Sequence, residues 1–275
     1  MSQTTTARHE ARADKARRNQ QQALSAFIAA KAEIDTLLGQ LQALSEDHFH
    51  AAPDSVHWGH VGSRFRFLQV RDGAIHPLDD FTARRFAKFN AKGRGFLPAA
   101  EFDMIHVTGA RVYVWGLFVQ VLRALSGGSF VSSGLVRRML ADGLRGQSGY
   151  RLAAGLAAAG KAQVLLSPVA FYTAIPPARA GAISPEMAAL IPGHLPRFWA
   201  TLAEIAAGDG IVLLPQPEET VTGGLFTDPA YAVADHLAKG DYEHHNPAYG
   251  ALILARAIAL ARGGQACGGA VRSAG

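Results

Sequence analysis

Apolar residues recur at three- and four-residue steps across residues 20–44. The apolar members are Leu24, Phe27, Ile28, Ile34, Leu37, Leu38, Leu41 and Leu44, and Lys31 takes one step of the series. This spacing predicts a long amphipathic helix. Its stripe is too extensive to remain in water. We therefore expect the helix either to pack on the following domain or to pair with a second copy of the chain as a homo-oligomer.

After residue 71 the pattern changes to short apolar runs that alternate with helical periodicity. Strands are expected at residues 102–108, ending at Gly109; at 162–167, stopped by Pro168; and at 211–214, stopped by Pro215. Helices are expected at residues 135–144, 150–159, 195–207 and 247–262. Strands that alternate with helices predict an α/β fold with a parallel sheet covered on both faces. Functional residues then gather at the carboxyl ends of the strands.

The ends of the chain differ in composition from this central part. Residues 1–18 form a polar, basic leader and residues 263–275 a glycine-rich tail, and both are expected to be disordered. Residues 19–62 are expected to be a helical N-terminal module with a histidine-rich linker, and residues 63–262 an α/β domain.

Charge and cysteine usage narrow the class of protein. The net charge is +5 over 275 residues, and no aromatic residues are interleaved with the basic residues of the ends, so no nucleic-acid partner is expected. Cys267 is the only cysteine, which suits a reducing compartment and leaves no internal disulfide. Neither a signal peptide nor an apolar window of 18 residues is visible, so a cytoplasmic protein without a membrane span is expected.

The segment with the clearest chemistry is Asp241-Tyr242-Glu243-His244-His245-Asn246-Pro247. An Asp three residues before a His lets the carboxylate meet one ring nitrogen and fix the tautomer. The other nitrogen is then free to take a proton from a nucleophile. His244 is therefore the candidate base and Asp241 its orienting acid.

The order of these segments resembles the SGNH/GDSL hydrolase superfamily. Residues 102–109 are similar to the family's middle strand, residues 164–168 to the strand that follows, and residues 241–250 to its final Asp-x-x-His block. The resemblance implies a three-layer, flavodoxin-like parallel-sheet domain. It also implies oxyanion donors near Gly109, where Arg111 replaces the family's asparagine or instead pairs with an acid at the sheet edge, and a site contact from Asn246.

The family's serine nucleophile is not where the resemblance places it. Ser63 follows Gly62 and is the local candidate. Residues 65–70 themselves read as a strand, however, which leaves no room for the helix that should follow the serine. Two readings stay open. Either Ser63 is the nucleophile, or the first block has been lost and residues 19–62 are a separate module joined to a truncated hydrolase fold.

The resemblance implies an esterase, deacetylase or acyl transferase, and it implies an ester of a bacterial surface carbohydrate as the substrate class. The alternative is a catalytically degenerate member that acts as a binding or assembly scaffold. No cofactor is expected. His244, His245 and Asp241, with His57 or His60, are the candidates for a metal, but adjacent histidines usually point apart, so no metal is expected. His106, inside an apolar strand, is expected to be a hydrogen-bonded core histidine.

Overall fold

The computed structural model describes residue 18 and residues 68–261, with gaps at residues 90–92, 129, 161 and 180. All described residues after residue 18 belong to one compact unit of the chain, His57–Gly275. The helix expected over residues 20–44, the serine at position 63, the linker histidines and Cys267 lie outside the described residues. The predictions that concern them therefore remain predictions.

A small antiparallel sheet precedes the main one. Its strands are β1 (Leu68–Arg71), β2 (Ala74–Pro77) and β3 (Leu97–Pro98), in that order. Asp72 and Gly73 join β1 to β2, both with positive φ (52° and 73°), as a two-residue hairpin requires. Helix α2 (Asp80–Phe89) lies between β2 and β3. Residues 68–71 thus belong to a hairpin, and they are not the first strand of the parallel sheet.

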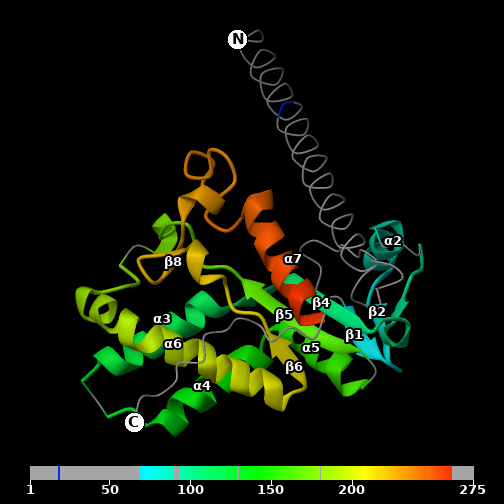
Figure 1. The fold of residues 1–275 in the computed structure, drawn as a ribbon, viewed down its shortest axis with the longest axis horizontal. Helices are drawn as coiled ribbons and strands as arrows, with labels where there is room; N and C mark the ends of the chain where they lie inside the picture. The colour runs from blue at the N-terminus through cyan, green and yellow to red at the C-terminus, as the bar shows by residue number, and fades with distance from the viewer. Residues whose placement is uncertain are drawn as a thin grey trace, which may run out of the picture. The chain divides into compact units, whose positions relative to one another are not determined.

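The main sheet is parallel, in the order β4 (Met104–Tyr113), β5 (Gln163–Val169) and β6 (Ile211–Leu213). Leu165 of β5 pairs with His106 on one side and with Val212 on the other. The mixed α/β class with a parallel sheet is confirmed (Figure 1). Within the described residues the strand order has no reversal.

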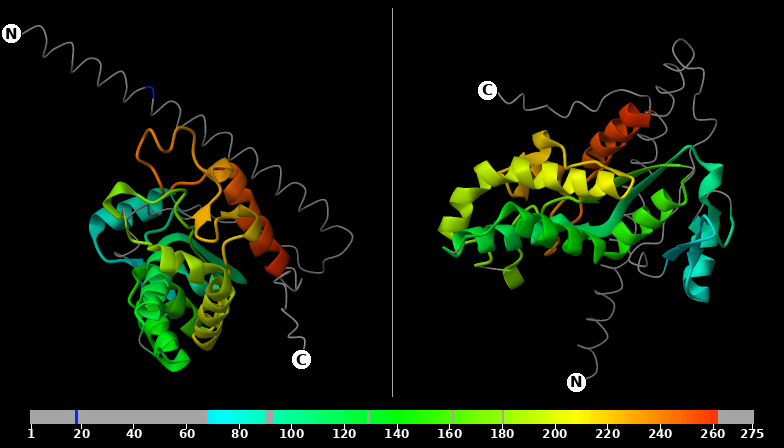
Figure 2. Two further views of the ribbon diagram at one scale, coloured as in Figure 1. Left: turned by 90° about the vertical axis from the view of Figure 1, so that its left-hand side faces the viewer. Right: turned by 90° about the horizontal axis from the view of Figure 1, so that it is seen from below.

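Helices cover both faces of this sheet. One face packs on α5 (Ser148–Ala158) and α6 (Pro185–Gly208), and α3 (Val114–Ser126) and α4 (Ser133–Arg145) pack on these helices. The larger core lies here and includes Val107, Val164, Leu166 and Ile211 of the sheet. The opposite face presents Leu165 and Leu214 to Ala257 of α7 (Pro247–Ala261). Helices α3 and α6 run side by side (Figure 2), and the rings of Phe118 and Phe198 meet between them at 4.7 Å. Successive apolar residues of the strands, which point to opposite faces of the sheet, are thus buried on both faces.

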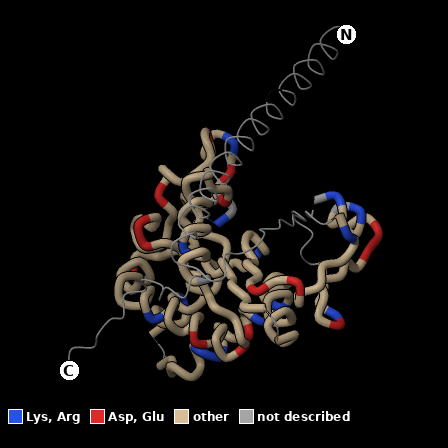
Figure 3. The backbone as a smooth tube through the Cα atoms, turned by 45° about the vertical axis from the view of Figure 1, so that its right-hand side comes forward, with Lys and Arg blue, Asp and Glu red and all other residues tan. Residues whose placement is uncertain are grey.

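The remaining described elements are short. They are the 3-10 turns η2 (Ala99–Glu101), η3 (Pro177–Arg179), η4 (Glu218–Thr220) and η5 (Pro229–Tyr231), and the two-stranded ribbon of β7 (Val221–Thr222) and β8 (Phe226–Thr227). None of the helices in the described part of the chain is long and apolar enough to cross a membrane. Basic and acidic residues are interspersed along the described backbone (Figure 3).

Three predicted boundaries are wrong. Strand β4 continues past Gly109 to Tyr113, because Gly109 and Arg111 adopt positive φ (60° and 57°) and form an irregularity after which pairing resumes. Strand β5 continues through Pro168 to Val169. Helix α6 begins at Pro185, ten residues before the predicted start, where the Ser184 hydroxyl caps it by accepting from the N–H of Met187 at 3.3 Å.

Candidate functional site

The loop that carries Asp241 and His244 lies at the carboxyl edge of the parallel sheet. The N–H of Thr173, four residues beyond the end of β5, donates to the carbonyl of Tyr242 at 3.1 Å. On its other side the loop forms an antiparallel β-bridge, between His245 and Ala232 of the preceding segment. The loop is therefore fastened to the edge where the sequence predicts the chemistry to lie.

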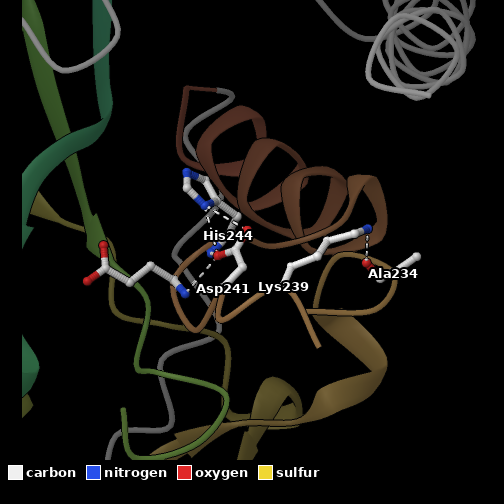
Figure 4. A network of polar contacts seen from close by, with 5 residues as sticks. Ala234, Lys239, Asp241 and His244 are labelled. Carbon is white, nitrogen blue, oxygen red and sulfur yellow. Dashed lines mark hydrogen bonds and ion pairs between the residues drawn. The ribbon is translucent and has the colours of Figure 1, made fainter. Parts of the chain in front are cut away.

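The spacing of Asp241 and His244 produces the predicted contact. Nδ1 of His244 lies 2.9 Å from Oδ1 and 3.0 Å from Oδ2 of Asp241, and the backbone N–H of His244 donates to Oδ1 at 3.0 Å. Figure 4 shows the ring beside the carboxylate, with Lys239 turned away to the carbonyl of Ala234. The contact fixes the proton on Nδ1 and leaves Nε2 as the acceptor. The His244 side chain is 79% exposed, so this nitrogen can be reached from solvent.

Asp241 is held as a carboxylate. Partial burial acts to raise its pKa, but the backbone N–H and ring of His244, together with the N–H of Glu243, outweigh that effect and lower the pKa below its usual value. Its side chain is only 25% exposed. A charged acceptor at this position stabilises an imidazolium on His244 without taking its proton.

The neighbouring His245 has a different environment. Its ring packs on Tyr249 with centroids 4.6 Å apart, and its buried Nε2 has no hydrogen-bond partner among the described residues. Burial lowers the pKa of His245 to about 4, and the charge of His244 acts in the same direction. His245 is thus a neutral side chain that packs against α7.

Asn246, predicted as a site contact, is occupied in holding the loop. Its Nδ2 donates to the carbonyl of Ala230 at 2.7 Å, and its Oδ1 accepts from the N–H of Tyr249 at 3.2 Å, in the manner of a helix N-cap. Pro247 follows at the first position of α7, where the absence of an N–H costs least. The structure gives Asn246 a structural role, and its contact with a substrate stays a prediction.

Gly109 and Arg111 lie on the same edge as the loop, at the irregularity of β4. Both are exposed, and the left-handed backbone at Arg111 is unusual for a residue with a side chain. Tyr113 follows at the end of β4, where its N–H donates to Oε1 of Gln147 at 2.5 Å. In the described chain Arg111 has no carboxylate within 4 Å, so its pairing with an acid is not observed.

The predicted nucleophile, Ser63, lies outside the described residues, so its distance to His244 is not part of this structure. A different serine meets a histidine inside the sheet, where Nε2 of His106 lies 2.8 Å from Oγ of Ser167. Ser167 is 2% exposed, and burial lowers the pKa of His106 to about 4. His106 is therefore the hydrogen-bonded histidine that the sequence predicts inside this strand. Because the Ser167 hydroxyl is buried, a substrate cannot reach it.

A cluster of aromatic and charged residues beside the loop escaped the sequence analysis. The guanidinium of Arg179 lies over the rings of Trp115 and Tyr172, 5.4 and 5.3 Å from their centroids. Burial raises the pKa of the Tyr172 hydroxyl, the charge of Arg179 lowers it, and the charge of Glu243 raises it. Each aromatic residue lies shortly after the start or end of an element at the carboxyl edge. Their position in sequence, next to the predicted carboxyl edge, was the one signal that could have indicated this cluster.

A buried amide holds the segment between this cluster and the loop. Oε1 of Gln216 accepts from the N–H of Phe171 at 2.8 Å, and its Nε2 donates to the hydroxyls of Thr220 and Thr227 at 3.1 and 2.9 Å. The Thr227 hydroxyl in turn donates to the carbonyl of Phe171 at 2.6 Å. All three polar side chains are at most 5% exposed. The network fixes Phe171 and, two residues on, Thr173, the residue that fastens the loop.

Among the described residues no three histidine, cysteine or carboxylate side chains come together as a metal site. No model of a protein family matches the chain, and neither a curated protein nor a solved structure matches it. The geometry of the loop and its surroundings therefore carries the functional argument.

Proposed function

We propose that this protein hydrolyses or transfers an acyl ester, with His244 as general base and Asp241 as the acid that orients it. The observation that carries the proposal is the contact of Nδ1 of His244 with the Asp241 carboxylate, which leaves the exposed Nε2 free. The same proposal assigns the chain to the SGNH/GDSL type, with the described parallel sheet as part of a flavodoxin-like domain. An ester of a carbohydrate is the substrate class that this resemblance implies.

In the proposed reaction Nε2 of His244 takes the proton of the Ser63 hydroxyl as Oγ attacks the ester carbonyl. Asp241 stabilises the imidazolium that forms. The imidazolium then gives its proton to the departing alkoxide, which leaves an acyl-serine. Water, or an acceptor hydroxyl in the case of transfer, attacks that intermediate with His244 again as the base. Backbone N–H groups near Gly109 support the charge on the carbonyl oxygen.

One observation favours the second candidate, a scaffold without catalytic activity. Within the described chain, every hydrogen bond of the His244 ring goes to Asp241, and no hydroxyl group is in contact with Nε2. A loop held in this way also serves as a rigid surface for binding. The two candidates differ in whether a serine reacts covalently.

The deciding experiment is labelling of the full chain with a fluorophosphonate probe, together with hydrolysis of p-nitrophenyl acetate. We expect the parent and His194→Ala, a matched histidine change on α6, to be labelled and active, and Ser63→Ala to be neither. His244→Ala should slow both reactions strongly. An unlabelled, inactive parent would leave the scaffold as the function. Labelling that survives Ser63→Ala would show that another serine is the nucleophile.

A further inference from the structure

Two arginines lie at the carboxyl edge of the sheet, where the loop with Asp241 and His244 also lies. Arg179 is placed there by aromatic rings and Arg111 by its backbone at the end of β4. Arg179 stacks on a pair of rings, Trp115 and Tyr172, which themselves meet edge to face at 5.0 Å. Both rings are at most 5% exposed, whereas Arg179 is exposed. A guanidinium that rests its face on aromatic rings keeps its N–H donors at the edge, where they can meet a planar anion.

Arg111 reaches the same region through its backbone. It occupies the left-handed region at φ 57°, two residues after Gly109 at φ 60°, within the irregularity of β4. That conformation disfavours a side chain relative to an ordinary backbone, and glycine would avoid the cost. Strain of this kind is concentrated at functional sites, and here it presents a charged side chain at the carboxyl edge.

The charges of both arginines influence the Tyr113 hydroxyl. Burial and the charge of Glu243 raise the pKa of the Tyr113 hydroxyl, and the positive charges of Arg111 and Arg179 partly offset this rise. Glu243 is the nearby carboxylate, and its charge also raises the pKa of the Tyr172 hydroxyl, in addition to burial. In the described part of the chain, neither guanidinium has a carboxylate within 4 Å. Tyr113, two residues after Arg111, pairs with Val169 at the end of β5, and Trp115 and Tyr172, the rings under Arg179, follow these two positions closely. Both arginines therefore belong to this edge, and among the described residues both are exposed and without an ion-pair partner.

We propose that Arg179 and Arg111 form a binding site for an anionic group, a carboxylate or a phosphate, on the molecule that the edge binds. Arg179 offers a forked pair of donors beside the rings of Trp115 and Tyr172, and Arg111 supplies the second charge from the end of β4. The inference deepens the proposed function, on which it rests, by assigning an acidic substrate to the same edge. The ester would then sit on an acidic sugar or a sugar phosphate.

The test is binding of small probes to the full chain, followed through the arginine Nε–H resonances. D-Glucuronate carries a carboxylate, D-glucose 6-phosphate carries a phosphate, and D-glucose is their neutral match. We expect one or both anions to bind at least about tenfold more tightly than D-glucose, with shifts at Arg179 and Arg111. The tighter of the two anions identifies the chemical group.

Substitutions then locate the site. Arg179→Gln and Arg111→Gln should each weaken anion binding about tenfold or more, because each removes one charged donor group. Arg123→Gln, an exposed arginine on α3 without an ion pair in the described chain, is the matched control and should change nothing. Arg111→Gly is expected to relieve the strained backbone, and its thermal unfolding is measured beside its binding. Lost binding in a variant that unfolds at or above the parent's temperature is a loss of the site and not of the fold.

The inference is overturned if D-glucose binds as tightly as the anions, if neither anion binds saturably, or if Arg123→Gln weakens binding as much as the other two substitutions. Its failure is distinguishable from that of the proposed function. Ester hydrolysis without anion binding would remove this inference alone, and anion binding by a chain that the fluorophosphonate leaves unlabelled would remove the hydrolase proposal alone.

Discussion

His244 makes two contacts with one carboxylate oxygen of Asp241, Oδ1. Its ring nitrogen Nδ1 lies 2.9 Å from this oxygen, and its backbone N–H donates to it at 3.0 Å. The backbone contact belongs to the turn itself, since an Asp side chain commonly accepts from N–H groups two and three residues ahead. The ring contact uses that turn to fix a tautomer. A change at Asp241 therefore separates loop structure from chemistry.

Asp241→Asn keeps an oxygen for the turn but loses the charge and favours the wrong tautomer of His244. We expect ester hydrolysis to fall on the order of 10²–10⁴-fold, mainly in kcat, with little change in the midpoint of urea unfolding. Steady-state kinetics with p-nitrophenyl acetate and an unfolding curve measure the two effects. Activity equal to the parent's would show that Asp241 only shapes the turn.

The buried amide of Gln216 is predicted to support the whole site. Gln216→Leu removes the acceptor of the Phe171 N–H and leaves the hydroxyls of Thr220 and Thr227 without their donor. Leaving buried polar groups unpaired costs about 1–3 kcal/mol each, so we expect unfolding free energy to drop by about 2–4 kcal/mol. Urea denaturation measures it.

The matched control for that change is Gln163→Leu. Gln163 is exposed at the first position of β5, and we expect the substitution to shift stability by less than about 0.5 kcal/mol. Equal effects at the two positions would show that the amide network contributes nothing specific. A loss confined to Gln216→Leu, with altered His244 resonances, would connect the network to the loop.

The sequence was sufficient to predict those features that depend on residues close to one another along the chain. The Asp241–His244 contact joins residues three apart, and the core strands and four helices follow from their own apolar periodicity. Pro168 was read as the end of a strand because proline lacks an N–H. It is tolerated because β6 pairs with β5 only as far as Leu166, so no ladder bond to β6 is lost there.

Sequence was insufficient where distant segments meet. The stacking of Arg179 on Trp115 brings together residues 64 positions apart, and nothing in either segment encodes the partner. The early start of α6 was hidden by Pro192 and Pro196, which suggest a break, although the Ser184 cap and Pro185 already mark a helix start. Local rules conflict there, and tertiary packing decides between them.

The left-handed backbone of Arg111 predicts a stability gain on substitution by glycine. Arg111→Gly removes the strain of a side chain at φ 57°, offset in part by the greater entropy of glycine in the unfolded chain. We expect a net gain of about 0.5–1 kcal/mol, whereas Arg111→Ala keeps the strain and gains nothing. Thermal unfolding of the two variants checks this prediction. A destabilised Arg111→Gly would mean that the arginine side chain itself holds the strand.

Substitution by alanine is expected to lower the unfolding free energy at Gly149 and to raise it at Gly116. A Cβ at Gly149 would lie 2.0 Å from the carbonyl oxygen of Ala110, so α5 must move away from β4 to accept it. A Cβ at Gly116, inside α3, meets nothing within 4 Å. We expect Gly149→Ala to cost about 3 kcal/mol or more and Gly116→Ala to add about 0.5–1 kcal/mol. Urea denaturation of both variants decides it, and a tolerated Gly149→Ala would contradict the close packing of α5 on β4.

Two partly buried histidines contribute to the response of stability to acid. Burial lowers the pKa of His106 and of His245 to about 4, below the value near 6.5 of an unfolded histidine. The unfolded chain therefore binds protons first as the pH falls. Their contribution to stability is complete above about pH 6.5 and is lost progressively between about pH 6.5 and 4, at about 1.4 kcal/mol per pH unit for each histidine at most.

Removing the titrating groups should flatten this slope. His245→Phe keeps a ring to pack on Tyr249, and His106→Gln keeps a group that can bond to Ser167. We expect each variant to lose about half of the histidine-dependent slope of unfolding free energy between pH 6.5 and 4, measured by urea denaturation at several pH values. The slope should be lost in the double variant, apart from what the carboxylates contribute near the lower limit. An unchanged slope in both single variants would show that the two rings are accessible to protons in the folded protein.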